Sequence, residues 1–383
     1  MKRFEIKWFG DFECLCGDCP YTCCRGWVIP LEERDIARFR KERGFLGLRL
    51  FFETHGFMSE KFNKGSGKCT FCGRDGLCKL QKKKGHEFIP WTCQSYPRFY
   101  RNFGRFEECC LDLSCPEAAR LMIANSGSCE MIEYEADPVT RPCATNDDEE
   151  FFDYLLAQRV KLLEVTKEHF VSDPAGVCEA LFAYSIKLQD HFLTGGSSTC
   201  DLSFDSFYPA FDNDKGTFSP CFPLSTEALS DILSSRLNHR RLKSVNPGLY
   251  RMFCKASQAL LIYERDKTTP WSLQVDGFFS EHPRVLSILG AYLTYYLFQY
   301  FLRTYETYSF RRQIALGLCH LSMILLLVMT GDGAGTCTDD FIAQIISVYN
   351  RRAYFNDQIL DDMYRIFESH HRELTNTNIR SII

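Results

Sequence analysis

Apolar residues recur at helical spacing through most of the chain after about residue 147. Positions three and four residues apart lie on one face of an α-helix, so this pattern predicts helices that are partly or completely buried. A stretch rich in Gly, Ser, Asp and Pro near residues 193–224 interrupts the pattern and is typical of a long irregular loop. The expected helices are 151–170, 177–193, 250–266, 284–305, 310–329 and 341–371.

The first 125 residues have a different pattern. Cys, Gly, Phe and charged residues follow one another without a sustained period, and helical spacing is restricted to residues 31–43 and 115–124. We therefore expect little regular secondary structure there. The predicted fold class is mainly α, with an irregular cysteine-rich, metal-binding domain over residues 1–130 and an α-helical domain over residues 131–383.

Length and charge narrow the possible functions. At 383 residues the chain can bury a substantial core, and its formal net charge is −4. It has no run of five or more Lys and Arg residues, so a nucleic-acid partner is not expected. The N-terminus lacks the apolar segment of a secretory signal, which predicts a cytoplasmic protein. Residues 316–330 are strongly apolar, but this segment is shorter than the ~20 residues that span a bilayer, so we expect a buried helix and no membrane partner.

Cysteine is the residue type with the most uneven distribution. The chain contains 20 cysteines, and 12 of them lie within residues 1–115. In a large chain without a secretory signal, clustered cysteines indicate metal or redox chemistry rather than disulfides. Neighbouring thiolates repel one another unless a cation or an iron–sulfide core neutralises them, so the clustering favours a soft metal. Only His55 and His86 fall in the same region, which indicates an all-thiolate site.

Two kinds of metal centre fit this cysteine pattern. Zinc usually takes paired C-x2-C motifs, which occur at 16–19 and 69–72. Iron–sulfur clusters also take four cysteines but tolerate less regular spacing. Spacing alone does not choose between them, and buried free cysteines without a metal are the third alternative. The usual radical S-adenosylmethionine motif, C-x3-C-x2-C, begins at Cys19 and Cys23 but has Gly26 in place of its third cysteine, so it is absent.

Three longer segments carry most of these cysteines: FECLCGDCPYTCCRGW, CTFCGRDGLCKLQKKKGHEFIPWTCQSYPR and LDLSCPEAARLMI. In this order, over about residues 10–125, they resemble the N-terminal signature of the flagellin lysine-N-methylase family. Residues 281–303 are similar, more loosely, to the helical C-terminal part of that family. The positions that match the family's cysteine pattern are Cys14, Cys19, Cys23, Cys24, Cys69, Cys78, Cys93 and Cys115.

The other four N-terminal cysteines, Cys16, Cys72, Cys109 and Cys110, are additional to the family pattern. Because the zinc pairing depends on Cys16 and Cys72, the resemblance weakens zinc as the metal and favours iron–sulfur. It implies a [4Fe-4S] cluster for which four of the eight matching cysteines would suffice, with zinc as the alternative.

The resemblance also implies an activity. It implies methylation of the ε-amines of surface lysines, on flagellin or another lysine-bearing protein, with S-adenosylmethionine as the methyl donor. The alternative from a different class is a non-enzymatic zinc- or iron-binding or redox-sensing protein with a helical partner-binding domain. The sequence identifies no catalytic residue, no S-adenosylmethionine site and no oligomeric state.

Four further features have both a structural and a functional interpretation. The glycine segment 329–335 is expected to be a turn between helices rather than a cofactor loop. The aromatic residues of 291–305 are at helical spacing, which favours core packing over a cation–π cage. Glu281 and His282 precede a proline and are expected to cap a helix rather than form an acid/base pair. Arg98 either neutralises a thiolate-bound cluster, holds an anionic cofactor, or is a structural arginine.

Overall fold

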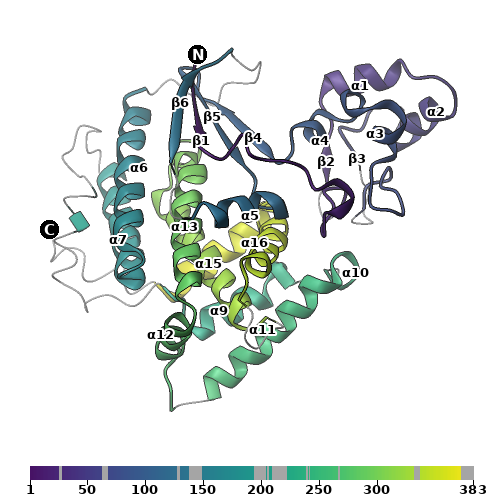
Figure 1. The fold of residues 1–383 in the computed structure, drawn as a ribbon. Coiled ribbons are helices and arrows are strands. Elements are labelled where there is room, and N and C mark those ends of the chain that lie inside the picture. The colour runs from purple at the N-terminus through teal and green to yellow at the C-terminus, as the bar shows by residue number, and fades with distance from the viewer. Residues whose placement is uncertain are drawn as a thin grey trace.

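The protein is mainly α-helical, which confirms the predicted fold class (Figure 1). The expected loop near residues 193–224 and the glycine segment 329–335 lie largely outside the residues that can be described. The computed structural model describes residues 1–25, 28–62, 68–126, 130–137, 149–193, 204, 207–208, 222–238, 240, 242–265, 268–331 and 337–371.

The helices after residue 115 form the body of the molecule, and each predicted segment is helical. Residues 341–371 were expected to form one helix but form two, because the Asn356 side chain accepts a hydrogen bond from the Ile359 N–H at 3.3 Å and caps a new helix. The helices are α5 (Pro116–Ala124), α6 (Glu149–His169), α7 (Pro174–Leu193), α9 (Thr226–Ser234), α10 (Leu242–Val245), α11 (Pro247–Arg265), α12 (Trp271–Glu281), α13 (Pro283–Tyr300), α14 (Thr304–Thr307), α15 (Phe310–Met329), α16 (Asp339–Ala353) and α17 (Asp357–His370), with short 3₁₀ turns η3 (Arg236–Asn238) and η4 (Phe301–Arg303).

The N-terminal region contributes strands to a four-stranded sheet. The expectation of little regular secondary structure is therefore wrong for this part of the region. Its strand order is β4-β5-β1-β6, with β1 parallel to β5 and the other two pairings antiparallel. The parallel pair joins distant segments, since Lys2 lies opposite Phe106. The strands are β1 (Lys2–Ile6), β4 (Arg98–Asn102), β5 (Phe106–Leu111) and β6 (Met131–Glu135).

Strand β5 attaches this sheet to the helical body. All six of its residues are buried. The Glu108 carboxylate on β5 is paired with Arg159 of α6, whose Nη1 lies 3.0 Å from the Glu108 Oε2. The Tyr295 hydroxyl of α13 donates to the Leu111 carbonyl at 2.6 Å and accepts from the Leu111 N–H at 2.8 Å. Burying a charged side chain requires such a partner, so the sheet and the body form one packed structure.

Between β1 and β4 the chain forms a smaller substructure, which we call the cysteine-rich unit (residues 14–97). The predicted helix in segment 31–43 is confirmed by α1, and the chain then turns at Gly44, whose φ of 67° favours glycine, before α2 begins. The elements of the unit are η1 (Cys16–Asp18), β2 (Ile29–Pro30), α1 (Glu33–Arg40), α2 (Gly44–Glu53), β3 (Lys61–Phe62), α3 (Lys79–Lys84), η2 (His86–Phe88) and α4 (Trp91–Ser95).

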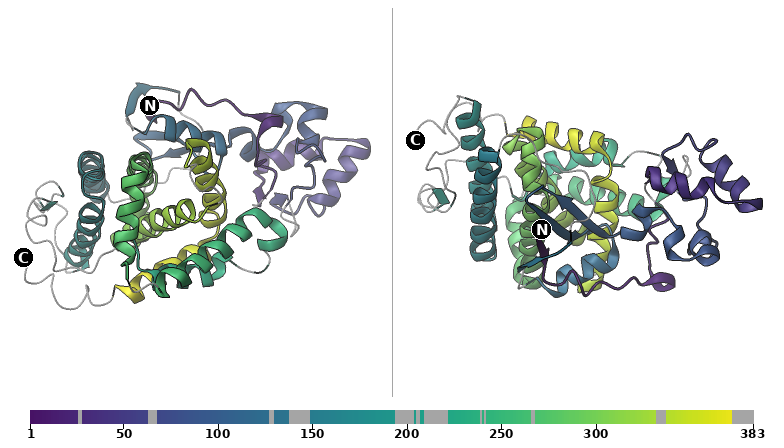
Figure 2. Two further views of the ribbon diagram at one scale, coloured as in Figure 1. Left: turned by 60° about the horizontal axis from the view of Figure 1, so that its bottom comes forward. Right: turned by 90° about the horizontal axis from the view of Figure 1, so that it is seen from above.

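The buried apolar side chains form two clusters. The smaller one lies within residues 24–89 of the cysteine-rich unit. The larger one contains residues from β1, β5 and α5 together with the long helices. Figure 2 shows the cysteine-rich unit at one side of the body. The domain division into residues 1–130 and 131–383 stays a prediction.

Two helical stretches of the body are long and apolar enough to cross a membrane by length and composition: Pro283–Thr307 and Phe310–Met329. The apolar segment 316–330 was expected to be too short to span a membrane, but it belongs to the 20-residue helix α15. Length therefore does not distinguish a buried helix from a membrane-spanning helix here. Burial is the better criterion, because 83% and 89% of the two apolar windows are buried inside the protein. Both are core helices, and α15 packs against α7, α13 and α17.

Candidate metal centre

Eight cysteines line one cavity of about 470 Å³, at the side of the cysteine-rich unit next to α5 and α16. They come from the segment 14–24 and from three single positions further along the chain, so tertiary folding brings the thiols together. Thiol groups are soft ligands, and no other side-chain type contributes as many groups to this cavity. The eight residues are Cys14, Cys16, Cys19, Cys23, Cys24, Cys78, Cys93 and Cys115.

Seven of the eight cysteines predicted as ligands are therefore brought together, and the eighth, Cys69, is not in the cavity lining. Cys69 is buried beside the cavity, where its backbone N–H donates to the Cys24 carbonyl at 2.8 Å. Cys16, which is additional to the family pattern, lines the cavity in its place. Binding of a metal by these residues stays a prediction.

The remaining N-terminal cysteines have structural positions. Cys72 is buried, and its backbone pairs with that of Cys78 in an isolated antiparallel β-bridge. Its Sγ lies 3.6 and 3.7 Å from the Gly73 and Gly76 carbonyl oxygens. Cys109 and Cys110 lie on β5 and belong to the larger core. Burial raises the pKa of the Cys110 thiol, so it is protonated.

Three thiols of the cavity are joined by hydrogen bonds. The buried Cys24 thiol is hydrogen-bonded to both Cys23 and Cys78, and these contacts raise its own pKa. The hydrogen bond from Cys24 lowers the pKa of Cys23 to about 7 and that of Cys78 to about 6, against the opposing effect of burial. Cys78 also precedes α3, and the backbone N–H groups of Leu80 and Gln81 stabilise its thiolate. These hydrogen bonds therefore favour the thiolate form of Cys23 and Cys78 and the neutral form of Cys24.

Four other thiols of the cavity are more easily protonated. Burial is the main cause that raises the pKa of Cys14, Cys19 and Cys115, the last to about 12. Burial also raises the pKa of Cys93 well above its usual value. Metal ligation requires thiolates, so binding at these positions would release protons.

Arg351, from the far end of the chain, reaches this cavity. Its guanidinium donates to the carbonyls of Thr22 at 2.9 Å, Tyr21 at 3.2 Å and Ser114 at 2.8 Å. It also approaches the Tyr96 hydroxyl at 3.5 Å. One side chain of α16 thus holds together the first cysteine segment and the turn before α5, which are about 90 residues apart in sequence.

Arg351 also supplies positive charge to the thiols. Burial opposes its charge, but Tyr96, Cys23 and Cys115 raise the pKa of the guanidinium above its usual value. In return the Arg351 charge lowers the pKa of Cys23 and Cys19. A guanidinium beside a thiolate site offsets part of its negative charge. Nothing in the sequence around Arg351 distinguishes it from the neighbouring Arg352, so sequence reasoning missed it.

Arg98, considered above as a charge partner of the site, also lines the cavity. Its Nη2 donates to the Phe12 carbonyl at 3.2 Å, and its guanidinium carbon lies 5.0 Å from the centre of the Phe12 ring. It therefore fixes the chain just before Cys14 and places a second positive charge at the cavity.

The donor set has the chemistry of a soft-metal site, because thiolates prefer zinc or iron–sulfur centres. The side chains are not already in ligand geometry: within the described residues, no group of three or more His, Cys, Asp or Glu is arranged to hold a metal ion. The Cys24 contacts to Cys23 and Cys78 are thiol hydrogen bonds, so ligation would require these side chains to turn toward a common point.

The other features singled out in the sequence have structural positions. The aromatic residues of 291–305 are core residues, as expected, with Tyr292, Tyr295 and Tyr296 almost completely buried. His282 occupies the N-cap position of α13 but makes no side-chain capping hydrogen bond.

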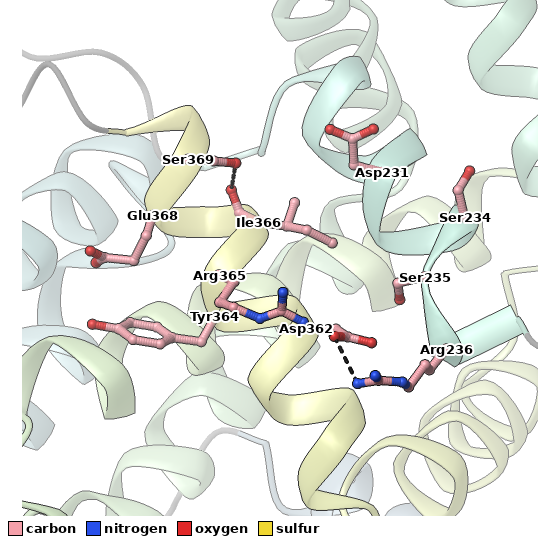
Figure 3. Close-up of a pocket in the computed structure, with 10 residues that line it drawn as sticks. All are labelled: Asp231, Ser234, Ser235, Arg236, Asp362, Tyr364, Arg365, Ile366, Glu368 and Ser369. Atoms are coloured by element: carbon pink, nitrogen blue, oxygen red, sulfur yellow. Dashed lines mark hydrogen bonds and ion pairs between the residues drawn. The ribbon is translucent and has the colours of Figure 1, made fainter.

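A wider surface pocket of about 1000 Å³ lies between α9 and α17 (Figure 3). It contains no cysteine, and its charged groups are paired with one another or with neighbouring residues. Asp231 accepts from the His370 Nε2 at 2.8 Å, and Asp362 is paired with Arg236 at 3.1 Å and with Arg365. These ion pairs use the charges that a ligand would need, so this pocket is a weaker candidate than the cysteine cavity.

The fold and the cavity together define a mainly α-helical protein with a cysteine-lined site. Comparison with known proteins finds partial similarity, at low identity, to lysine-N-methylases. The chain is 26% identical over 122 residues to a lysine-N-methylase of Salmonella choleraesuis and 27% identical over 115 residues to that of Salmonella typhimurium. It is also 26% identical over 122 residues to the flagellar biosynthetic protein FliU of Salmonella muenchen.

These similarities cover only part of each chain. They span 28–30% of this chain and of the two methylases, and 72% of the FliU protein. No family model matches the chain. No solved structure matches it either.

Proposed function

We propose that this chain is a cytoplasmic protein lysine N-methyltransferase that uses S-adenosylmethionine, acts on flagellin or another lysine-bearing protein, and carries a cysteine-ligated metal centre. The observation that carries the proposal is the convergence of eight cysteines on one cavity in a chain similar to lysine-N-methylases. Neither part is sufficient alone, since a thiol cavity fits many metalloproteins and the similarity covers 28–30% of the chain.

The metal in this proposal is a [4Fe-4S] cluster, with zinc as the alternative. Cys23, Cys24, Cys78 and Cys93 are the best-placed holders, because Cys24 is hydrogen-bonded to Cys23 and Cys78, and Cys93 is close enough to both for their charges to raise its pKa. A bound centre would neutralise the thiolates and cross-link segments that are distant in sequence. The structure supports the donor set and not a particular metal.

The reaction requires an unprotonated lysine. The nitrogen lone pair attacks the methyl carbon of the sulfonium, an N–C bond forms, and the S–C bond breaks with its electrons remaining on sulfur. The products are S-adenosylhomocysteine and a methylated amine that releases a proton. A lysine amine with a pKa near ~10.4 is mostly protonated at neutral pH, so the site must desolvate it or provide a proton acceptor.

The test begins with anaerobic purification, analysis of iron, zinc and acid-labile sulfide, and a visible spectrum. Iron with sulfide and a brown colour is expected. Methyl transfer is then measured with labelled S-adenosylmethionine and purified flagellin, and the modified residues are located by mass spectrometry. Zinc without sulfide would replace the iron–sulfur part of the proposal, and no transfer to flagellin or to proteins of the source lysate would contradict the activity.

A second candidate is a metal-binding or redox-sensing protein without enzymatic activity. The observation that favours it is the lowered pKa of Cys23 and Cys78, to about 7 and about 6, because thiolates at neutral pH are readily oxidised. The two functions differ in one measurement, since a methyltransferase binds S-adenosylmethionine and a sensor need not.

A further inference from the structure

Helix α2 of the cysteine-rich unit is apolar on two faces. Leu46 and Leu50 on one face are buried in the small core of the unit. A second face is apolar but exposed, although a helix with so little polar surface is normally buried in a core. Together with one residue of the turn that follows, it forms a surface that we call the α2 face: Phe45, Leu48, Phe51, Phe52 and Met58.

The helical body lies away from this surface. Figures 1 and 2 show α1 and α2 at the side of the cysteine-rich unit that is farthest from the body. Met58 and Phe45, at 87% and 79% exposure, are the most exposed large apolar side chains among the described residues. Exposed apolar side chains that cluster in this way are typical of an interaction surface.

The turn after α2 is fixed by Thr54. Its buried hydroxyl donates to the Leu50 carbonyl at 2.7 Å and accepts from the Phe57 N–H at 3.1 Å. The Thr54 carbonyl accepts from the Met58 N–H at 3.0 Å. The Phe57 ring packs against the Phe51 ring, with centroids 5.6 Å apart. The α2 face is therefore held in place before a partner binds.

Basic side chains border the α2 face. The Arg40 guanidinium carbon lies 5.9 Å from the centre of the Phe57 ring. Lys41 and Arg43 are exposed in the link between α1 and α2. Within the part of the chain that the structure describes, no ion pair joins Arg40, Lys41 or Arg43 to a carboxylate. Their three positive charges are therefore available to a partner.

The whole cysteine-rich unit has the same sign of charge. Residues 14–97 contain 15 Lys and Arg but 9 Asp and Glu, although the net charge of the chain is −4. Glu42, which lies between Lys41 and Arg43, is already paired with Lys84 at 2.8 Å. This field attracts an acidic partner and repels a cationic lysine, so the surface suits docking and not the methylation of a lysine.

Two other occupants fit the α2 face less well. A two-fold pair of copies would place the same positive charges twice in one interface. An anionic bilayer would accept apolar and basic side chains. The face is, however, built from Phe and Met and bordered by Arg, and these three types are enriched in protein–protein interfaces. Arginine also pairs with a carboxylate through two parallel hydrogen bonds.

We propose that the α2 face is a docking surface for the protein substrate, and that it binds a region of that protein where apolar side chains are bordered by Asp and Glu. The apolar side chains supply most of the affinity, and the basic border selects acidic partners. The inference rests on the proposed methyltransferase function, because an enzyme that modifies a protein can hold it at a surface away from the reacting lysine.

The test measures binding of purified flagellin to the full chain by biolayer interferometry, without S-adenosylmethionine. Phe45→Ser combined with Phe52→Ser should weaken binding roughly tenfold or more, because aromatic anchors carry much of the energy of an interface. Leu261→Ser combined with Ile262→Ser, at exposed residues of α11, is the matched control and should leave binding unchanged. All four side chains are exposed, so the fold should be kept, and circular dichroism with thermal unfolding checks this.

The basic border is tested by charge reversal. Lys41→Glu combined with Arg43→Glu should weaken binding roughly tenfold at low salt and remove most of the salt dependence that the natural chain shows. Lys243→Glu, at an exposed lysine of α10, is the control and should leave binding unchanged. In methyl-transfer assays the α2 variants should raise KM for flagellin and keep kcat, because docking stabilises the bound substrate and the transition state equally.

Vesicles of phosphatidylglycerol and analytical ultracentrifugation test the other two occupants. The inference is overturned if flagellin does not bind, or if every variant binds it as the natural chain does. Vesicle binding or self-association that the α2 variants lose, while they still bind flagellin, would also overturn it. If α2 variants methylate flagellin with the natural KM, the docking surface is lost and the proposed function is kept. Flagellin binding through the α2 face without methyl transfer would keep the surface and contradict the activity.

Discussion

The cysteine-rich unit and the helical body are stabilised in different ways. The body has a large apolar core in which α15 is buried along nearly its whole length. The unit has short helices, two-residue strands and a small core within residues 24–89. Apolar burial scales with size, so a small unit gains less stability per residue and depends more on cross-links. The comparison teaches that the cysteine cavity, at the edge of the small unit, is placed where a metal would contribute most to folding.

The largest expected effect follows from removing the proposed metal. Treatment with a chelator, or the substitution Cys78→Ala, should lower the free energy of unfolding of the cysteine-rich unit by several kcal/mol. The reason is that metal binding and folding are coupled in small metal-dependent folds. Hydrogen exchange should then increase in α1 and α2 and stay slow in α15. Cys254→Ala, at a cysteine of α11 outside the cavity, is the control and should change neither region. Unchanged exchange in α1 and α2 after metal loss would show that the small core is sufficient.

Two matched leucines compare the cores directly. Leu325 of α15 and Leu50 of α2 are both completely buried. Replacing either by Ala should cost about 2–5 kcal/mol, through lost transfer free energy and the cavity left behind. The difference lies in where the cost is seen. Leu325→Ala should lower the main thermal transition, whereas Leu50→Ala should increase hydrogen exchange only in the cysteine-rich unit. Equal lowering of one shared transition by both variants would show that the two regions unfold together.

Acid should weaken the body through a single buried histidine. His320 of α15 is completely buried, is surrounded by the rings of Tyr296, Tyr349 and Tyr354, and accepts or donates one hydrogen bond from its Nδ1 to the Tyr349 hydroxyl at 2.8 Å. Burial lowers its pKa from 6.5 to about 3. Between these values the unfolded chain binds the proton more readily, so this contribution to stability is complete above about pH 6.5 and decreases as the pH falls toward 3.

The size of that effect is measurable by variant comparison. Going from pH 8 to pH 5 should cost about 2 kcal/mol through this residue alone. Urea unfolding of His320→Gln at the two pH values should show a correspondingly smaller loss than the natural chain. His55→Gln, at an exposed histidine of the cysteine-rich unit, is the control and should keep the natural pH dependence. An identical pH dependence in His320→Gln would assign the acid sensitivity to other groups.

How much the sequence could predict also differs between the two regions. In the body, local periodicity predicts the long helices, and 310–329 was predicted with the bounds of α15. The sheet was missed because β1 is a five-residue strand whose partner β5 lies about 100 residues away, and a short apolar run contains no information about such a partner. Helices α9 and α12, of nine and eleven residues, were not predicted either.

The candidate site shows the same division. Cysteine spacing and resemblance selected seven of the eight cavity cysteines, because cysteine is rare enough for its positions to carry information by themselves. Arg351 could not be selected in this way. Charged residues are common, and their roles depend on which elements pack against each other, as α5 and α16 do here.

The smallest expected effect concerns the contact between the two regions. Arg351 and Arg352 are adjacent on α16, but Arg351 donates to carbonyls beside the cysteine cavity, whereas Arg352 donates to the Leu237 and Arg236 carbonyls at 2.9 and 2.6 Å. Arg351→Gln should cost about 1–3 kcal/mol, because it leaves buried carbonyls without a donor. The cost should be seen as faster exchange and proteolysis in residues 14–24.

Arg352→Gln loses the same kind of bond on the other side of the helix and is the matched control. It should increase hydrogen exchange in η3 and leave exchange and proteolysis in residues 14–24 unchanged. If both variants destabilise the cysteine segment equally, α16 acts as one rigid element and the contact is not specific to Arg351. If Arg351→Gln also lowers metal content at saturating metal while Arg352→Gln does not, then the body contributes directly to the stability of the centre that the small unit cannot form alone.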